Sequence, residues 1–346
     1  MMAAERQSNI EFLRILSMMA VITVHLDGAS LGLPTPGSLA GTSASDAWRI
    51  TVESITIVGV NCFTLISGYF GIRARVAGFL KFTLMCMFYS VGIYTAFAIY
   101  APSAWSWKGW FESWMVFSHT DLWYVPAYML LYLLSPMLNS AISSISRQQF
   151  RLWLGLFVIA NIWCGWLWEG NFNPTGYTVI QLIMMYLIGS YISLERDVIK
   201  VARKKIRFLS VAVYGTATAV SALLAVWLPP TMVYAYNSPW VIVSSVSLFI
   251  CFLTLRLKSE TINNLAKGAF AAYLIHKNPL IWGNIVRPLA VRGSEMCIRD
   301  RLTAYTIFCL AFTVAIYLAS SAADFIRRKL FGKIEALLDN KVKIKL

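Results

Sequence analysis

Hydrophobic residues in this 346-residue chain gather into long runs that are separated by short polar connections. A helix needs about 20 largely apolar residues to span a bilayer, and several stretches of the chain approach that length. The expected spans are residues 10–28, 50–72, 77–100, 121–141, 150–168, 176–194, 208–228, 239–257, 267–288 and 302–322. The pattern predicts an all-α, polytopic integral membrane protein with about ten transmembrane helices.

Positively charged residues are concentrated in alternate connections between these runs. Of the 30 Lys and Arg residues, 23 lie at the start of the first run, in or beside the 2–3, 4–5, 6–7 and 8–9 connections, or after the last run. Connections rich in Lys and Arg stay in the cytoplasm, so we expect both termini to be cytoplasmic. Topology therefore explains the net charge of +14, which on a soluble fold would indicate nucleic-acid binding. No nucleic-acid partner is expected.

The composition excludes two broad classes of protein. Only 13% of the residues are charged, 58% are hydrophobic and the mean hydropathy is +0.63, whereas soluble domains carry about 25% charged residues. A soluble cytosolic enzyme is thereby excluded, and the 14% of aromatic residues excludes a disordered chain. The six cysteines form no C-x-x-C pair and the three histidines (His25, His119, His276) are far apart. We therefore predict no disulfide framework, no metal site and no tightly bound cofactor.

The predicted organisation is one transmembrane domain, residues 1–322, followed by a basic amphipathic tail, residues 323–346, on the inner membrane surface. Residues 293–301 depart from the charge pattern because they place arginines in an outer connection. Their sequence, Gly-Ser-Glu-Met-Cys-Ile-Arg-Asp-Arg, resembles a translated sequencing-adapter artefact. An ordinary charged outer loop is the alternative interpretation, and no function is assigned to this segment.

Ionisable residues inside membrane spans are costly and are candidates for function. Arg14 and His25 are eleven positions apart in the first span, so both point along one helix face with an axial separation of about 16 Å. Arg14 could instead extend to the surface while pairing with Glu11 at i,i+3. His276, near the middle of the ninth span, is either a hydrogen-bonded core histidine or a functional one.

Two further groups of charges belong to the second span. Glu53 lies toward its outer end and could approach His25, where a carboxylate would orient the imidazole as a general base. A capping or interfacial role for Glu53 is equally open. Arg73 and Arg75 follow the inner end, where they either determine topology only or, beside Arg14, form a basic pocket suited to phosphates.

Four motifs occur in order on the first, second, fourth and ninth spans. They are Asn-Ile-Glu-Phe-Leu-Arg-Ile at 9–15 with His25 beyond it, Phe-Thr-Leu-Ile-Ser-Gly-Tyr-Phe at 63–70, Leu-Trp-Tyr-Val-Pro-Ala-Tyr at 122–128, and Tyr-Leu-Ile-His at 273–276. Together they resemble the membrane-bound acyltransferase family 3, which O-acylates bacterial cell-surface glycans. The family's inner Arg-x-x-Arg pair is replaced here by Arg73-Ala74-Arg75.

The resemblance implies a ten-helix O-acyltransferase of the bacterial cytoplasmic (inner) membrane. Such an enzyme moves an acyl group, usually acetyl, from cytoplasmic acyl-CoA to a hydroxyl of a cell-surface or lipid-linked glycan. Acyl-CoA is then a donor substrate and not a resident cofactor. By this resemblance Arg14, Arg73, Arg75 and Ser67 are expected to bind the donor.

The catalytic role by the same resemblance falls to His25 as general base, with Glu53 and His276 as further catalytic candidates. With no Ser or Cys predicted beside His25, direct transfer is favoured over a covalent acyl-enzyme. Two other interpretations stay open. One is a transporter or flippase for an anionic solute or a lipid-linked sugar, which broken helices or repeated halves would favour. The other is a non-catalytic partner in an envelope polysaccharide complex.

Overall fold

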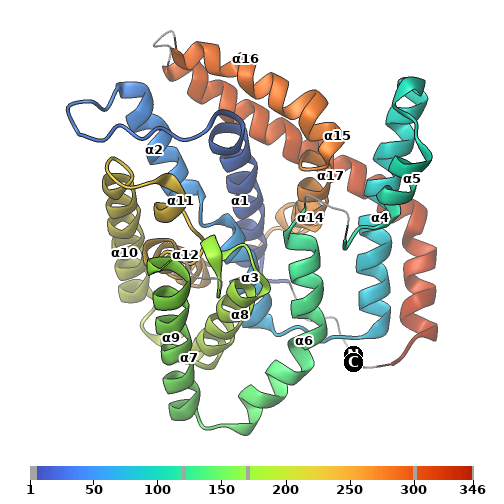
Figure 1. The fold of residues 1–346 in the computed structure, drawn as a ribbon. Helices are drawn as coiled ribbons and strands as arrows, with labels where there is room; N and C mark the ends of the chain where they lie inside the picture. Colours follow the sequence, from blue (N-terminus) through green and yellow to red (C-terminus); the bar gives the residue numbers. More distant parts are fainter. Residues whose placement is uncertain (1–5, 119–121, 169–171, 299–301, 345–346) are drawn as a thin grey trace.

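The computed structural model describes residues 6–118, 122–168, 172–298 and 302–344, and these parts of the chain contain helices and no β-strand (Figure 1). Seven helices in the described parts are long and apolar enough to cross a membrane. They are Ser8–Ala29, Ala44–Phe70, Val76–Tyr100, Tyr124–Ser144, Arg147–Leu167, Arg203–Leu224 and Leu302–Lys341. The chain is therefore an all-α, polytopic membrane protein, as predicted, and seven of the ten predicted spans coincide with a described helix of this length and composition.

Three of these long helices are composed of two segments each: α1 (Ser8–Val24) with η1 (His25–Ala29), α2 (Ala44–Thr56) with α3 (Gly59–Phe70), and α7 (Arg147–Asn161) with η3 (Ile162–Leu167). The other four are the single helices α4 (Val76–Tyr100), α6 (Tyr124–Ser144), α10 (Arg203–Leu224) and α17 (Leu302–Lys341). Two shorter apolar helices, α8 (Val179–Leu194) and α12 (Pro239–Leu253), coincide with the sixth and eighth predicted spans.

Short helices form the connections and the remaining predicted span. Those in the connections are η2 (Pro102–Ala104), α5 (Trp107–Trp114), η4 (Pro174–Gly176), α9 (Arg196–Val201), α11 (Pro230–Val233) and α13 (Glu260–Leu265). The series that follows α13 is η5 (Ala266–Gly268), α14 (Ala269–His276), α15 (Pro279–Ile281), η6 (Trp282–Val286) and α16 (Arg287–Ile298).

The ninth predicted span, residues 267–288, is broken rather than continuous. Helix α14 ends at His276, and Asn278 has an extended backbone with ψ of 131°. The Asn278 side chain caps the next helix by accepting a hydrogen bond from the Leu280 amide at 3.1 Å. Pro279 explains the break, because it has no N–H to donate and disfavours helical geometry in the residue before it.

The predicted boundary between a membrane domain and a tail at residue 322 is not visible as a break. Helix α17 runs through this position without interruption, from beside α16 to beside α4 (Figure 1). Asp324 accepts a hydrogen bond from the Tyr89 hydroxyl at 3.1 Å, and Asp339 pairs with Lys81 at 2.7 Å. Polar contacts to α4 thus hold the C-terminal half of α17 against the bundle. Of the suspected artefactual segment, residues 293–298 belong to α16 and residues 299–301 lie outside the described parts.

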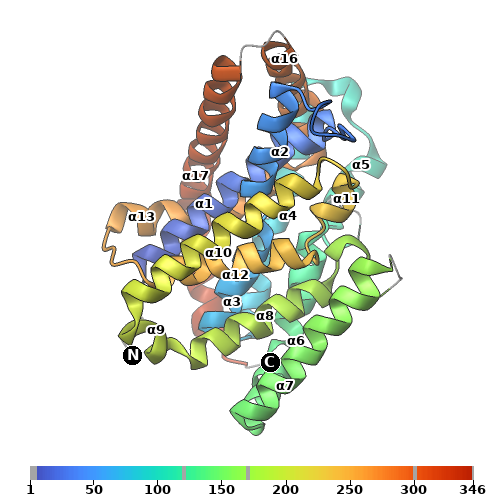
Figure 2. The same ribbon diagram turned by 90° about the vertical axis from the view of Figure 1, so that its left-hand side faces the viewer.

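Helix α1 lies at the centre of the bundle, where it packs against α2, α3, α12, α13, α14 and α17. On one flank, α10 and α12 lie side by side (Figure 2). Helices α3 and α8 pack closely together: a Cβ added at Gly68 would lie 2.0 Å from the Tyr186 carbonyl oxygen, and one at Gly189 would lie 2.3 Å from that of Leu65. Small residues allow this approach, as is common between membrane helices. The packing places the face of α1 that carries Arg14 and His25 toward the interior.

Candidate functional site

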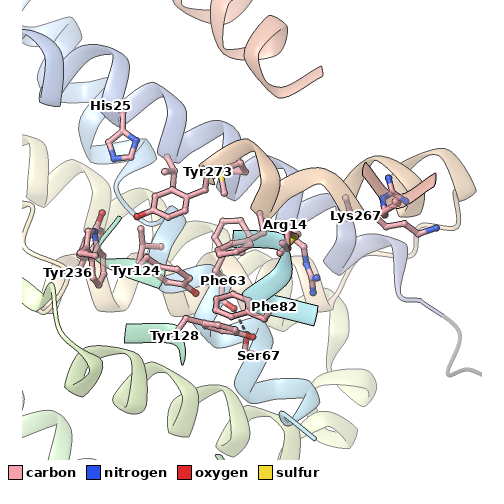
Figure 3. Close-up of a pocket in the computed structure, with 18 of the residues that line it drawn as sticks. Arg14, His25, Phe63, Ser67, Phe82, Tyr124, Tyr128, Tyr236, Lys267 and Tyr273 are labelled. Carbon is pink, nitrogen blue, oxygen red and sulfur yellow. Dashed lines mark hydrogen bonds between the residues drawn. The ribbon is translucent and has the colours of Figure 1, made fainter. Parts of the chain in front are cut away.

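A cavity of about 510 Å³ lies inside the bundle and is lined by residues of α1, α3, α4, α6, α14 and α17 (Figure 3). Its volume is in the range of sites that enclose small molecules. The lining residues are Arg6, Arg14, Met18, Val21, His25, Val60, Phe63, Ser67, Phe82, Met85, Trp123, Tyr124, Tyr128, Tyr236, Ala266, Lys267, Phe270, Tyr273 and Arg328. Three of the residues predicted from the sequence, Arg14, His25 and Ser67, are among them.

Four basic residues, Arg6, Arg14, Lys267 and Arg328, form what we call the cationic end of the cavity. In Figure 3, Arg14 and Lys267 lie on the side away from His25. Lys267 donates a hydrogen bond to the neutral amide oxygen of Asn264 at 2.7 Å, and no carboxylate lies within ion-pair distance of it in the described parts of the chain. A cluster of this kind attracts anionic groups such as phosphates.

The predicted pairing between Arg14 and Glu11 is present but loose. The Arg14 Nε to Glu11 Oε2 distance is 3.7 Å, and neither atom makes a hydrogen bond. The same carboxylate also lies 3.5 Å from Arg6. One negative charge is therefore shared between two arginines, and Arg14 remains available to a ligand in the cavity.

His25 and His276 form a hydrogen-bonded pair at the opposite end. His25 Nδ1 lies 2.9 Å from His276 Nε2, and His276 Nδ1 lies 2.5 Å from the carbonyl oxygen of Ala272. A carbonyl oxygen only accepts hydrogen bonds, so His276 carries its proton on Nδ1 and, when neutral, its Nε2 accepts from His25. This arrangement leaves His25 Nε2 unprotonated. It is the arrangement that a general base requires.

Irregular backbone places both histidines. His25 is the first residue of η1, a π-helical segment that continues α1, and such segments often occur at functional sites because the extra residue per turn redirects a side chain. The Ser30 hydroxyl donates to the His25 carbonyl oxygen at 2.9 Å. His276 is the last residue of α14, immediately before the break at Asn278. The two residues therefore meet at a helix distortion and a helix end.

Aromatic side chains form the wall between the two ends of the cavity. The rings of Tyr124 and Tyr128 stack at 5.6 Å, and those of Trp123 and Tyr236 at 5.8 Å. Two buried side-chain amides hold Tyr236 in place: Asn61 Nδ2 and Gln181 Nε2 donate to its carbonyl oxygen at 3.0 and 2.7 Å. The wall is apolar with hydroxyl groups at intervals, and is suited to an extended organic chain.

Ser67 lies on this wall beside Tyr128 (Figure 3). Its hydroxyl donates to the Phe63 carbonyl oxygen at 3.1 Å and lies 3.5 Å from the Tyr128 hydroxyl. It is the single serine or cysteine in the described lining. Because His25 Nδ1 is engaged by His276 and Ser67 by its own helix, the geometry contains no histidine-activated serine.

Of the two roles left open for Glu53, the first would bring it to His25, but no hydrogen bond between them is found in the described parts of the chain. The carboxylate is buried against the backbone of Gly28, with Oε2 unpartnered, and it is not among the cavity-lining residues. The hydrogen-bond partner of His25 Nδ1, the nitrogen that fixes the tautomer of this histidine, is His276 and not Glu53. Nearby, Asp27 pairs with Arg49 at 2.9 Å and accepts from the Tyr305 hydroxyl at 2.8 Å. Glu53 therefore lies near the polar network of Asp27, Arg49 and Tyr305 and not in the cavity lining.

Arg73 and Arg75 also lie outside the cavity lining. Gly71, at φ 71°, ends α3 and turns the chain toward α4, which leaves both arginines exposed. Arg75 lies 3.8 Å from Asp339 of α17. Instead, Arg6, Lys267 and Arg328 line the cavity together with Arg14, where Arg73 and Arg75 were expected. Sequence reasoning had counted these three as topological charges, and nothing in their local pattern distinguished them from the other basic residues.

The other predictions from the sequence concern His119, metal binding and disulfides. His119 lies outside the described residues. Within the described parts of the chain, no group of three or more His, Cys, Asp or Glu residues is arranged to hold a metal ion, and none of the five cysteines described there forms a disulfide.

The fold and the cavity define a polytopic membrane protein with an ionisable site enclosed in its helix bundle. Comparison with models of protein families matches residues 7–321 to the membrane family described as the acyltransferase domain, and the chain belongs to this family. It is therefore a membrane acyltransferase. Searches of curated proteins and of solved structures found no significant match.

Proposed function

We propose that this protein transfers an acetyl group from cytoplasmic acetyl-CoA to a hydroxyl of a cell-surface or lipid-linked glycan in the bacterial cytoplasmic membrane. One observation carries the proposal: a single cavity has Arg14 and three further cations at one end and His25, paired with His276, at the other. A CoA thioester has the same polarity, because its phosphates and its reactive carbonyl lie at opposite ends of a long arm.

The cationic end suits the phosphates of CoA. Arginine recognises phosphate through paired N–H donors, and lysine acts as a point charge. The arm that links the phosphates to the thioester would follow the wall formed by Met18, Phe63 and Phe82. Helix geometry separates Arg14 from His25 by about 16 Å along the axis, so an extended arm brings the thioester toward the histidine pair.

The proposed chemistry is direct acyl transfer. His25 Nε2 accepts the proton of the sugar hydroxyl while that oxygen forms a bond to the thioester carbonyl carbon. The C–S bond then breaks, and the protonated His25 returns the proton to the departing thiolate. General base catalysis of this kind contributes about 10² to 10⁴ in rate. His276 acts as a positioning residue because its Nε2 holds the His25 tautomer that can accept a proton.

The deciding experiment incubates membranes that contain the protein with radiolabelled acetyl-CoA and measures label in the glycan fraction. We expect transfer by the wild type and loss of transfer in His25→Ala. Thr23→Ala is a matched control, since Thr23 lies on the same helix and outside the described cavity lining. Near-normal transfer by His25→Ala, with equal protein in the membranes, would contradict the assignment of the base.

A transporter or flippase for an anionic solute or lipid-linked sugar is the second candidate. The break at Asn278 favours it, because discontinuous helices form the substrate sites of many transporters. Proteoliposomes separate the two functions. Transport predicts movement of a labelled lipid-linked sugar without acetyl-CoA, whereas the transferase predicts release of free CoA that depends on both substrates.

A further inference from the structure

A second cavity, of about 310 Å³, lies beside the first and contains none of the residues discussed as catalytic or donor-binding. It is formed by the end of η3, the segment around η4, and the chain from α11 to the start of α12. Its lining residues are Gly165, Trp166, Pro174, Thr175, Thr231, Met232, Ala235 and Asn237. None of them carries a charge, so the chemistry of the lining favours an uncharged ligand.

The second cavity contains a buried hydrogen-bond acceptor without a partner. Asn237 is 0% exposed, and its Nδ2 donates to the Asn173 carbonyl oxygen at 2.7 Å. Because that carbonyl only accepts, the nitrogen must face it, and the amide oxygen is the atom left over. Asn237 Oδ1 has no hydrogen-bond partner in the structure. An unsatisfied buried polar atom costs about 1–3 kcal/mol, and a ligand hydroxyl would relieve this cost once a small shift of the lining opens a path to the oxygen.

The rim of this cavity is held in place before any ligand arrives. Thr175 has φ of 56°, an uncommon conformation for a β-branched residue that costs about 1–3 kcal/mol. Its carbonyl oxygen accepts from the Tyr236 amide at 2.9 Å. Elsewhere in the lining, the Trp166 indole N–H donates to the Met232 carbonyl oxygen at 2.8 Å. Strain of this kind persists where the surrounding structure supports it, often at binding sites.

One peptide segment separates the two cavities. Tyr236 lines the first cavity and the adjacent Asn237 lines the second. Both connections that form the second cavity, 5–6 and 7–8, are on the outer side in the topology that the charge distribution predicts. An acceptor that reaches His25 from outside could therefore extend across this segment.

We propose that the second cavity binds a neutral sugar unit of the acceptor glycan, next to the unit that is acylated. The inference rests on the proposed function. The Trp166 ring offers an apolar face to the C–H surface of a sugar ring. A small shift of the lining would let the buried Asn237 Oδ1 accept a hydrogen bond from a sugar hydroxyl, and Thr231 is exposed at the rim. These groups together recognise a pyranose without requiring a charge on it.

Binding is tested on the full chain in lipid nanodiscs, with His25→Ala as background so that no turnover occurs. The probes are the neutral trisaccharides maltotriose and chitotriose and the matching monosaccharides, detected by saturation-transfer NMR. We expect at least one trisaccharide to bind more tightly than its monosaccharide. Thr231→Trp, which fills the cavity from its exposed rim, should weaken that binding tenfold or more. Ser103→Trp, which adds the same ring to the exposed η2 segment, is the control and should bind as the parent does.

Trp166→Ala tests the aromatic part of the lining, in case the Thr231 variant does not fold, and it should cause a similar loss. The inference is overturned if neither trisaccharide binds, or if folded Thr231→Trp or Trp166→Ala binds as tightly as the parent.

The labelled acetyl-CoA assay distinguishes this failure from a failure of the proposed function. Acetyl transfer with an acceptor KM that is unchanged in Thr231→Trp overturns the second site and leaves the transferase standing. Trisaccharide binding that is sensitive to Thr231→Trp, without acetyl transfer by the wild-type protein, supports the sugar site and rejects the transferase. The full proposal predicts an acceptor KM at least tenfold higher in Thr231→Trp and an unchanged KM for acetyl-CoA.

Discussion

The most specific prediction concerns His276, which acts on the reaction only through His25. The change is His276→Leu, which keeps an apolar side chain at a site that is 1% exposed but removes the acceptor for His25 Nδ1. A donor left unpaired in a buried site costs about 1–3 kcal/mol. If this cost is felt in the transition state, kcat falls by about 5- to 150-fold, since 1.36 kcal/mol corresponds to a factor of ten.

The assay is steady-state release of free CoA by purified protein in nanodiscs, with acetyl-CoA and acceptor varied separately. We expect KM for acetyl-CoA to be unchanged, because His276 is not among the described residues that line the cavity. His276→Gln should recover part of kcat, since its amide oxygen can replace Nε2 as the acceptor. Leu274→Ala controls for destabilisation: it truncates a buried residue on the same helix at about 2–5 kcal/mol without removing a polar partner.

Two results would refute this reasoning. One is a kcat for His276→Leu within twofold of the wild type. The other is an equal loss in His276→Leu and Leu274→Ala at matched thermal stability, which would mean that the loss reflects packing and not the hydrogen bond to His25.

Three further predictions follow from the site and the packing. Arg14→Gln should raise KM for acetyl-CoA about tenfold or more, because it removes a charge-assisted hydrogen bond worth about 1.5–3 kcal/mol. The control Arg73→Gln should leave this KM unchanged, and equal effects of the two variants would place the donor elsewhere. Gly68→Ala should lower the melting temperature because its Cβ would meet the α8 backbone. The control Gly92→Ala, which faces open space, should not lower it, and equal melting temperatures would contradict the close α3–α8 contact. Glu53→Gln should keep kcat within about threefold because Glu53 is not among the described lining residues; a loss comparable to that of a catalytic base would reinstate the carboxylate.

Membrane class and the stripe on the first helix were predictable because both depend on local sequence. Apolar runs of sufficient length partition into a bilayer whatever their neighbours are, and residues eleven apart on a helix face the same way in any fold. The structure accordingly places Arg14 and His25 in one cavity. The break at Pro279 was also a local signal, and the expectation of a continuous ninth span overlooked it.

The partner of His25 was not predictable in the same way. His25 and His276 are 251 positions apart and meet only because α1 packs against α14. Glu53 was an equally plausible partner from its depth in the second span, and only the packing decides against it. The positions of Arg73 and Arg75 were unpredictable for a related reason: both follow the turn at Gly71 and lie outside the described cavity lining, and this depends on how α3 and α4 are joined.

Hydropathy, helical periodicity and four short motifs were enough to identify a helical membrane protein of an acyltransferase family, with an arginine and a histidine on a shared helix face. The charges that join Arg14, the residue that orients His25, and the second, uncharged cavity beside the first emerged from the packing of the helices. This division follows from the range of the forces involved. Hydropathy and helical periodicity act over a few neighbouring residues, whereas a site is assembled by contacts between helices that are far apart in the chain, and small residues such as Gly68 and Gly189 set how closely those helices approach.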